Sequence, residues 1–476
     1  KNNNMNQQIV NIDYKWLMEP TGDPFADVGG YALKEFAKRF PEKNILELIE
    51  EVSKIYVNRW EAKINSFFLN SKITQPAFKG GRKIEETMKY FQELLEGKSS
   101  VGTGYCRITG QKTQLFVAGR DNSILSGSST FVNFHHTFEA GIMVSKEVLI
   151  RFHFVPLACI LLQGRIALIH SNDSQLTEFF ATANCSANLS AVATNNSGGI
   201  LKSACKAPST ALFRFIDKVL GDSWDERGKK HFSLTLYHFT NYCASPEVQI
   251  YTVPTEVFSF YIFTQNGEFK EEWNRFVENY YCTAEYKGAK YNEDSLQIDF
   301  EKKNQRESIP SEVYQNWSNL VYSGLLDGKS ILPFMRSWSE NHTLNLKIVE
   351  KYLTRIRHMK QEAQKKILEL ADFMVKIEGE HKIGKCIQEI KNAKSSSALT
   401  RLLINKVLAK NLEMQNPPIL TVQECCEYLF PEEVFWRDVR DVFLIAIYQK
   451  LHEKGIFLNA VETEGINEEE FESINE

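Results

Sequence analysis

Apolar residues recur at every third or fourth position through residues 45–69, the spacing that gathers them on one face of a helix. A turn rich in proline and glycine at 20–24 precedes this segment. The sequence therefore predicts one long amphipathic helix. Its apolar face would consist of Leu46, Ile49, Val52, Tyr56, Trp60, Ile64 and Phe67.

Alternation of apolar and polar side chains indicates strands further along the chain. Residues 232–240 alternate in this way, and residues 248–263 form a β-branched and aromatic run that predicts a second strand. Residues 98–130 are dense in Gly, Ser and Thr, which predicts loops and brief strands. Residues 1–340 are therefore predicted to form a mixed α+β body.

From about residue 343 onward the apolar pattern is helical only. One stripe contains Leu346, Val349, Leu353, Ile356, Ala363, Ile367, Leu370 and Met374. Residues 421–424 have the spacing of a capping box that opens a later helix. Helices with one apolar face each must pack together, so residues 341–476 are predicted to form a C-terminal helical bundle, and the fold class is α+β.

Charge is distributed unevenly along the chain. The net charge is only −4, which argues against a protein that coats nucleic acid over its whole surface. Residues 345–411 nevertheless hold 15 Lys and Arg against 7 Asp and Glu, whereas residues 412–476 hold 4 against 15. A basic segment beside an acidic tail indicates local binding of a polyanion.

The cysteines show no C-x-x-C spacing, so we interpret them as reduced, mostly buried residues and expect no metal site. They are Cys106, Cys159, Cys185, Cys205, Cys243, Cys282, Cys386, Cys425 and Cys426. No apolar run approaches the roughly 18–20 residues of a membrane span, and the first residues lack signal-peptide features. We therefore expect a soluble, cytoplasmic protein.

No P-loop, dinucleotide fingerprint, H-E-x-x-H or G-x-S-x-G motif is present. The densest group of candidate metal ligands is His135, His136 and Glu139, but adjacent histidines in a strand point to opposite faces, so we interpret them as packing residues. Asp23 and Asp27 could be paired carboxylates. Beside glycine and proline they are better interpreted as turn or capping residues.

Cations with helical spacing are stronger candidates for function. Lys347, Lys351 and Arg355 lie four residues apart, opposite the apolar stripe, where they could neutralise successive phosphates, although a solvated helix face has the same pattern. The candidates for contact with strand phosphates are Lys347, Lys351, Arg355, Lys365, Lys366, Arg401 and Lys406.

A second set of candidates lies on predicted loops of the body. The basic turn at 79–83 contains two glycines that would allow close approach to a duplex, although ordinary surface turns look the same. Asn122 could pair with an adenine edge in the major groove. The candidates for duplex or guide-RNA contact are Lys79, Arg82, Lys83, Arg120, Asn122, Asn133 and Lys202.

Five segments between residues 21 and 255 share their order with a known family. They are TGDPFADVG at 21–29, FVNFH at 131–135 with Phe138 and Gly141, FVPL at 154–157, GRIALIHSN at 164–172, and LTLYHFTNY at 234–242 with Ile250 and Tyr251. No single segment is a chemical signature. Together, over about half of the chain, they resemble the large subunit of type I-B CRISPR-associated interference complexes, called Cascade.

The resemblance implies an α+β body, a helical bundle and no catalytic residues or cofactor. It implies that the subunit caps the guide-RNA complex at its 5′ end, reads the protospacer-adjacent motif (PAM) in duplex DNA, and helps to hold the opened strands. The implied partners are the guide RNA, double-stranded target DNA, the backbone, 5′-handle-binding and small subunits, and a helicase-nuclease recruited in trans. No membrane is implied.

The chain departs from the family's pattern in one respect. Many members carry two C-x-x-C pairs, one followed by glycine and one shortly before the F-x-P-L stretch. Here the two places read CRITG at 106–110 and SKEV at 145–148, so at most one of four thiolates is kept. One ligand cannot assemble a tetrahedral zinc site, so we predict no zinc and expect local packing to hold this region.

Two alternative functions are distinguishable. The large subunit of a transposon-associated CRISPR complex would direct integration, and transposase genes would then accompany it in place of a helicase-nuclease gene. A metal-dependent nuclease would use His135 or His136 with Glu139. The purified chain would in that case cleave DNA when a divalent metal is added, and we expect no such turnover.

Overall fold

An antiparallel sheet of four strands forms where the sequence alternates or runs apolar. Its strands, in spatial order, are β4 (Ile160–Leu162), β5 (Arg165–Ser171), β6 (Leu234–Thr240) and β7 (Glu247–Val253). Gln163 and Gly164 join β4 to β5, and both have positive φ. Two such residues make the type I′ turn whose twist matches that of the paired strands. Strand β5, paired on both sides and mostly buried, is central to the sheet.

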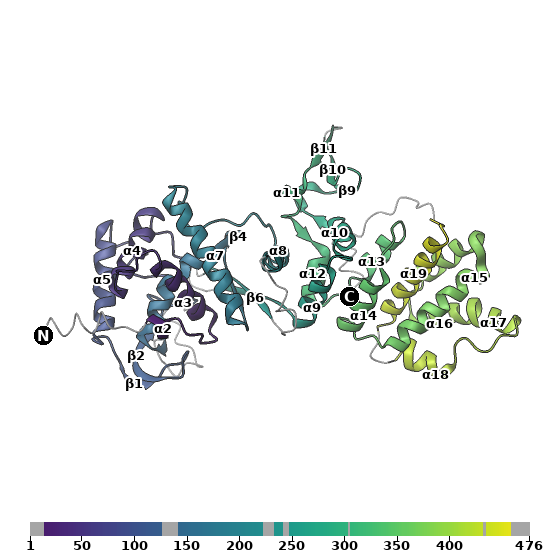
Figure 1. Ribbon diagram of the computed structural model, residues 1–476, viewed down its shortest axis with the longest axis horizontal. Coiled ribbons are helices and arrows are strands. Elements are labelled where there is room, and N and C mark those ends of the chain that lie inside the picture. The colour runs from purple at the N-terminus through teal and green to yellow at the C-terminus, as the bar shows by residue number, and fades with distance from the viewer. Residues whose placement is uncertain are drawn as a thin grey trace. The chain divides into compact units, whose positions relative to one another are not determined.

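Helices of the same half of the chain cover this sheet (Figure 1). Helices α3 (Pro24–Ala37) and α7 (Ser174–Ala193) pack against β5, and α6 (Lys146–Phe154) packs against α3. Helix α3 begins at Pro24 because the Asp23 side chain caps it and proline tolerates the first turn. Also present are α2 (Tyr14–Leu17), α4 (Ile45–Lys54), α5 (Gly81–Leu95) and a sheet of β1 (Gly102–Tyr105), β2 (Lys112–Ala118) and β3 (Ile142–Val144).

The computed structural model describes residues 14–125, 141–221, 233–240, 247–302, 305–431 and 435–457. Within these, the chain divides into two compact units. The first comprises Lys1–Phe215 and His231–Pro254, and the second comprises Ile216–Lys230 and Thr255–Glu476.

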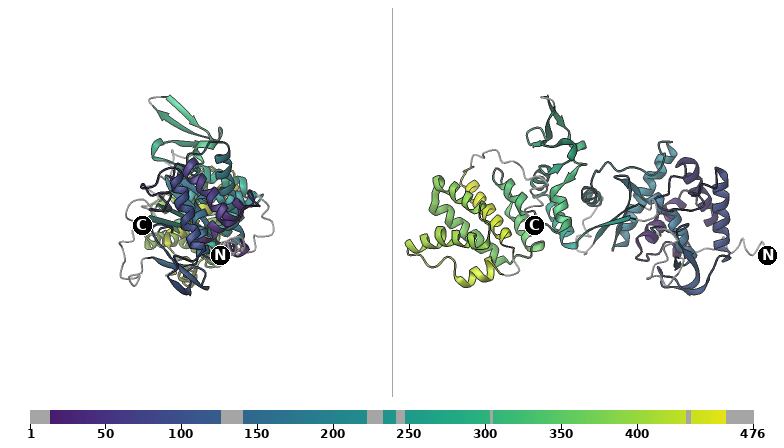
Figure 2. Two further views of the ribbon diagram at one scale, coloured as in Figure 1. Left: turned by 90° about the vertical axis from the view of Figure 1, so that its left-hand side faces the viewer. Right: turned by 180° about the vertical axis from the view of Figure 1, so that it is seen from behind.

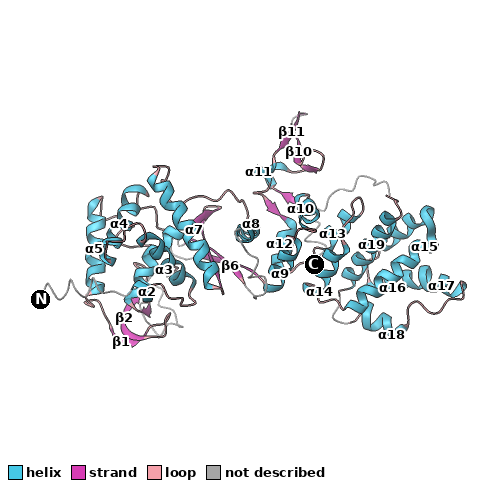
Figure 3. Cartoon of the chain, in the orientation of Figure 1, coloured by secondary structure: helices cyan, strands magenta, loops and turns pink. Residues whose placement is uncertain are grey.

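The second unit is built mainly of helices (Figure 3). It also carries a small sheet of β9 (Lys290–Asn292), β10 (Gln297–Lys302) and β11 (Gln305–Ile309), whose hairpin projects from the helices in Figure 2. After β12 (Ser318–Asn319) the described residues contain helices only. These are α12 (Leu320–Asp327), α13 (Leu332–Ser339), α14 (Leu346–Arg355), α15 (Gln361–Lys391), α16 (Ser396–Leu403), α17 (Ala409–Glu413), α18 (Val422–Glu424) and α19 (Trp436–Glu453).

The α+β class is confirmed, whereas the two units do not divide at the predicted boundary of 340. Residues 255–340 pack with the later helices. The Phe260 and Tyr352 ring centroids lie 5.6 Å apart, and Arg336 Nη1 lies 2.7 Å from Asp441 Oδ1. The change in composition near 340 therefore lies inside the second unit, after its last strand has ended at Asn319.

Two predicted elements are wrong in part. The helix predicted over 45–69 ends in a π-helical turn (Ile55–Arg59), because Glu61 and Ala62 adopt left-handed φ values of 51° and 57°. Its apolar face is buried all the same, except for Leu46, which is half-buried. The strand predicted over 248–263 becomes β7 and then, after a proline, α9 (Thr255–Thr264), whose aromatic residues are buried on a helix. The capping box at 421–424 is confirmed.

The cysteine prediction holds for most described positions. Cys106, Cys159, Cys185, Cys205 and Cys386 are buried, whereas Cys426 is exposed, and the described cysteines are free thiols. Cys243 lies outside the described residues. None of the helices in the described part of the chain has the length and apolar character that a membrane crossing needs.

A glycine-dependent contact between α3 and α6 gives a test of this packing. A Cβ at Gly29 would overlap the Arg151 carbonyl and approach Val155 Cγ2 to 2.9 Å, whereas a Cβ at Gly81 would meet nothing within 4 Å. We expect Gly29→Ala to lower the free energy of unfolding by about 3 kcal/mol, because backbone cannot move aside cheaply. Gly81→Ala should change it by less than about 1 kcal/mol. Equal urea midpoints for both variants would contradict the contact.

Candidate nucleic-acid interface

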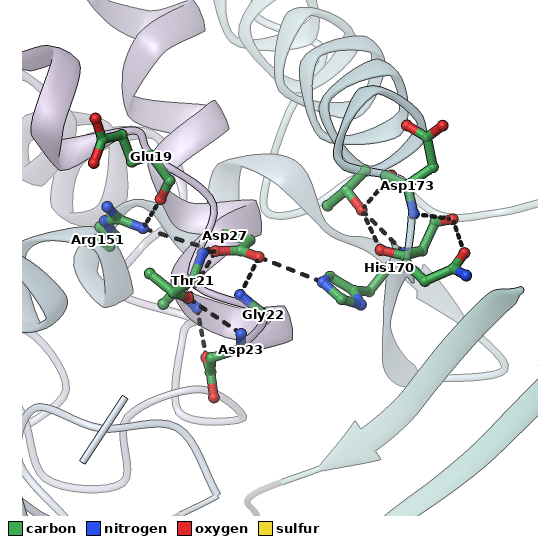
Figure 4. A network of polar contacts seen from close by, with 12 residues as sticks. Glu19, Thr21, Gly22, Asp23, Asp27, Arg151, His170 and Asp173 are labelled. Atoms are coloured by element: carbon green, nitrogen blue, oxygen red, sulfur yellow. Dashed lines mark hydrogen bonds and ion pairs between the residues drawn. The ribbon is translucent and has the colours of Figure 1, made fainter. Parts of the chain in front are cut away.

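A buried carboxylate joins two of the segments that carry the resemblance (Figure 4). Asp27 Oδ1 accepts hydrogen bonds from Thr21 N at 2.6 Å and Thr21 Oγ1 at 2.7 Å, and Oδ2 accepts from Gly22 N at 3.0 Å. Arg151 Nη1 lies 3.8 Å from Oδ1, and His170 Nε2 lies 3.5 Å from Oδ2. The turn before α3, helix α6 and strand β5 therefore meet at one side chain.

The groups around the Asp27 carboxylate indicate that its role is structural. Burial acts to raise the pKa of Asp27, but hydrogen bonds from His170, Thr21 and Gly22 outweigh it and hold that pKa below its ordinary value. Asp23 caps α3 instead, accepting from Ala26 N at 2.7 Å, and burial raises its pKa. The interpretation of Asp23 as a capping residue is confirmed.

The two places where the resemblance of the sequence implies C-x-x-C pairs lie side by side in the first unit. The Cys106 thiol accepts hydrogen bonds from Thr109 N at 3.4 Å and from Ser145 N at 3.3 Å. The Ser145 hydroxyl then caps α6 by accepting from Val148 N at 3.4 Å. Positions 106, 109, 145 and 148 are thus linked in a row, although 35 residues separate the second from the third.

Burial and hydrogen bonding, rather than a metal, can hold this junction. Cys106 is 2% exposed. Burial acts to raise the pKa of its thiol, but hydrogen bonds from Thr109, Ser145 and Ile108 lower it. Among the described residues no group of three or more His, Cys, Asp or Glu side chains is placed to hold a metal ion.

The basic turn predicted at 79–83 ends at Gly80, because α5 begins at Gly81 and carries Arg82 and Lys83 in its first turn. The cations of this segment differ in their contacts. Lys79 is exposed, and the Arg82 side chain is 64% exposed, 3.7 Å from Glu86 Oε1 and over the ring of Phe78. Lys83 instead donates to the carbonyls of Ile73 and Gln75, and burial lowers its pKa. Lys79 and Arg82 are the cations of this segment that face solvent.

The turn after β2 contacts the chain before this basic segment, since Asn70 Nδ2 donates to Asp121 Oδ1 at 3.1 Å. Asn122 uses its whole amide inside the protein. Oδ1 accepts from Gly119 N at 2.8 Å, and Nδ2 donates to Tyr90 Oη at 2.8 Å and Val117 O at 3.0 Å. These bonds weigh against the adenine-reading role predicted for Asn122, because it would have to break them.

Of the remaining candidates in residues 1–340, one is half-buried and one is exposed. Arg120 is half-buried, and its Nε is sealed from solvent without a partner among the described residues. Lys202 is exposed on a segment that bridges to Leu161 at the edge of the sheet. Asn133 lies outside the described residues, as do His135, His136 and Glu139 of the nuclease alternative.

Much of the positive charge in the basic segment of the second unit, residues 345–411, is neutralised by carboxylates of the same unit. Lys366 Nζ lies 2.9 Å from Glu369 Oε2 and 3.0 Å from Glu424 Oε1, and although burial opposes its charge these carboxylates raise its pKa. Lys406 lies 3.2 Å from Glu389. The charge contrast in the sequence is therefore partly an internal pairing, and Lys366 and Lys406 are poor candidates for free phosphate contacts.

Other cations of this unit face solvent. Lys347 is 67% exposed and 3.4 Å from Glu268 Oε1, and Lys351 lies over the ring of Phe263 at 5.2 Å from its centroid. Arg355 at the end of α14, Lys365 on α15 and Arg401 on α16 are exposed. These three, with Lys79, Arg82 and Lys202 of the first unit, are the predicted contacts most open to a phosphate.

Comparison with protein-family models and with curated protein sequences finds no match. The functional assignment therefore depends on the geometry above and on the resemblance carried by the sequence segments.

Placing thiolates at positions 109, 145 and 148, beside Cys106, tests whether the four positions converge closely enough to share one metal ion. We expect the variant Thr109→Cys/Ser145→Cys/Val148→Cys to bind about one zinc ion per chain, because four thiolates satisfy tetrahedral zinc. Metal content would be measured after dialysis against a weak chelator. The same triple variant with Cys106→Ser is the control and should lose the metal. Zinc content equal to that of the unmodified chain would contradict the convergence.

Proposed function

We propose that this protein is the large subunit of a type I-B CRISPR surveillance complex. It reads a short motif in duplex DNA beside the target and helps to hold the opened strands. The guide RNA supplies the long specificity by base pairing, and a helicase-nuclease recruited in trans cuts the DNA. The subunit itself contributes binding and positioning.

The junction at Cys106 is the observation that carries this proposal. The resemblance assigns positions 106 and 109 to one half of a metal site and positions 145 and 148 to the other half. In the structure Thr109 N and Ser145 N both donate to the Cys106 thiol. A chance likeness of short segments would give no reason for these positions to meet, so their contact supports the family assignment.

The exposed cations support the binding role. In the second unit Arg355, Lys365 and Arg401 are exposed while neighbouring lysines are paired with carboxylates. Side chains of this kind neutralise phosphates and release counterions, which gives affinity without base specificity. In the first unit Lys79 and Arg82 flank a glycine pair that leaves room for a close approach.

Purification of the complex tests the assignment directly. The operon would be expressed with an affinity-tagged copy of this chain, and the RNA that co-purifies would be sequenced. We expect short RNAs that share one repeat-derived 5′ end and differ in the following guide. Absence of RNA from a complex that contains this chain would contradict the proposal.

Neutralising the exposed cations of the second unit should weaken DNA binding in a salt-dependent way. For a complex that carries Arg355→Gln/Lys365→Gln/Arg401→Gln we expect the slope of log affinity against log salt to fall in magnitude by about two to three, since each lost phosphate contact removes about 0.7 to 0.9. Lys376→Gln, which removes an exposed lysine paired with Asp372, is the control. An unchanged slope in the triple variant would remove these residues from the interface.

A further inference from the structure

A pocket in the first unit adjoins the start of α5, since Ile73 and Thr87, which line it, are both hydrogen-bonded to Lys83. Four elements contribute to it, namely the loop before α5, helix α5, the turn after β2, and helix α6. Its volume is about 170 Å³. It is lined by Phe68, Ser71, Lys72, Ile73, Thr87, Tyr90, Phe91, Asp121, Asn122, Leu149 and His153.

His153 presents an acceptor nitrogen to a ligand. Ser53 Oγ donates its only hydrogen to Ile49 O at 2.6 Å, so at its 3.1 Å contact with His153 Nε2 it must accept. Nε2 therefore carries the hydrogen, and because burial lowers the pKa of His153 to about 3 the ring is neutral. Nδ1 is left as a bare acceptor, without a hydrogen-bond partner among the described residues, on a side chain that is 7% exposed.

Tyr90 supplies the complementary donor. Its hydroxyl oxygen accepts from Asn122 Nδ2 at 2.8 Å, which leaves the phenolic hydrogen available. The Asn122 amide fixes this orientation because its other contacts, to Gly119 and Val117, hold it in the turn. The pocket thus offers a donor and an acceptor, which are the groups that the edges of nucleobases pair with.

The aromatic side chains and the volume of the pocket limit the class of ligand that it can bind. Phe68, Tyr90 and Phe91 supply aromatic surface, on which every base can stack whatever its sequence. A cavity of roughly 150 Å³ accepts a benzene-sized ring, so this pocket holds one planar ring system and not a whole nucleotide. Lys72 and Asp121 line it with opposite charges, which favours a neutral group over a phosphate.

We propose that the pocket receives a single unstacked nucleobase of a nucleic-acid strand whose backbone passes the exposed cations Lys79 and Arg82. The inference rests on the proposed function, since it requires that the chain binds a strand at this face. Stacking on Tyr90 and Phe91 offsets the free-energy cost of unstacking the base. The protein thereby holds the strand at one nucleotide and does not read the sequence along the rest of the strand.

Photo-cross-linking of the full chain tests the inference. Single-stranded DNA and RNA with one 5-iodouracil would be irradiated on the protein, and the cross-linked residue identified by mass spectrometry. We expect cross-links at Tyr90, Phe91 or His153. In the variant Tyr90→Phe/His153→Phe the yield at Phe91 should fall about three- to tenfold, because two hydrogen bonds are lost while the rings remain.

Tyr105→Phe, which removes an exposed phenol on β1, is the matched control and should leave the yield unchanged. Thermal unfolding checks that the double variant is folded, which we expect because Ser53 keeps its bond to Ile49 and Asn122 keeps its bond to Val117. Intact binding with cross-links only outside the pocket would overturn the inference and leave the proposed function standing. Equal labelling by free 5-iodouridine monophosphate would assign the pocket to a free nucleotide. Failure to bind any oligonucleotide, even in the purified complex, would overturn both.

Discussion

The first unit depends on the burial of Asp27 among its donors. A charged carboxylate in the interior is tolerated only because backbone amides, a hydroxyl, a guanidinium and an imidazole surround it. Arg151 extends the contact by donating to the carbonyls of Glu19 and Trp16 at 2.8 and 3.0 Å. Removal of the Asp27 carboxylate would leave the Arg151 guanidinium buried without its counter-charge, and a buried charge of this kind costs about 3–5 kcal/mol in proteins.

Helix α6 connects Asp27 with the Cys106 junction and with the aromatic pocket. Its first turn is capped by Ser145, whose amide reaches the Cys106 thiol, and its middle carries Arg151, which faces Asp27. Its last turn places His153 in the aromatic pocket, against Phe91 at 4.8 Å between centroids. Three contacts distant in sequence are therefore positioned by one short helix of nine residues.

Local signals in the sequence predicted local structure well. The cap at Asp23, the alternation of β6 and the capping box at 421–424 each depend on neighbours within a few residues. The helix over 45–69 failed because apolar spacing does not reveal left-handed residues such as Glu61. The strand over 248–263 failed because aromatic residues suit a buried helix as well as a sheet.

The candidate site could be predicted only in part, because the sequence does not show which side chains are already bound by other segments. Charge and loop context pointed to Lys83, Asn122 and Lys366, but a sequence cannot indicate that a carbonyl, a phenol or a carboxylate of a distant segment will already occupy them. The pocket as a whole was not predicted, because its residues come from four separate elements. Asn122 was a candidate from its loop context, and His153 carried a further signal, as a histidine inside an apolar run.

The thiol at Cys106 has a consequence for how the protein matures. Domains closed by four metal-bound thiolates acquire their folding free energy from the ion, so chelators denature them and their synthesis depends on metal supply. Here amide-to-sulfur hydrogen bonds and an ordinary helix cap occupy the same junction. We therefore expect the chain to close this region whatever the zinc supply of the cell.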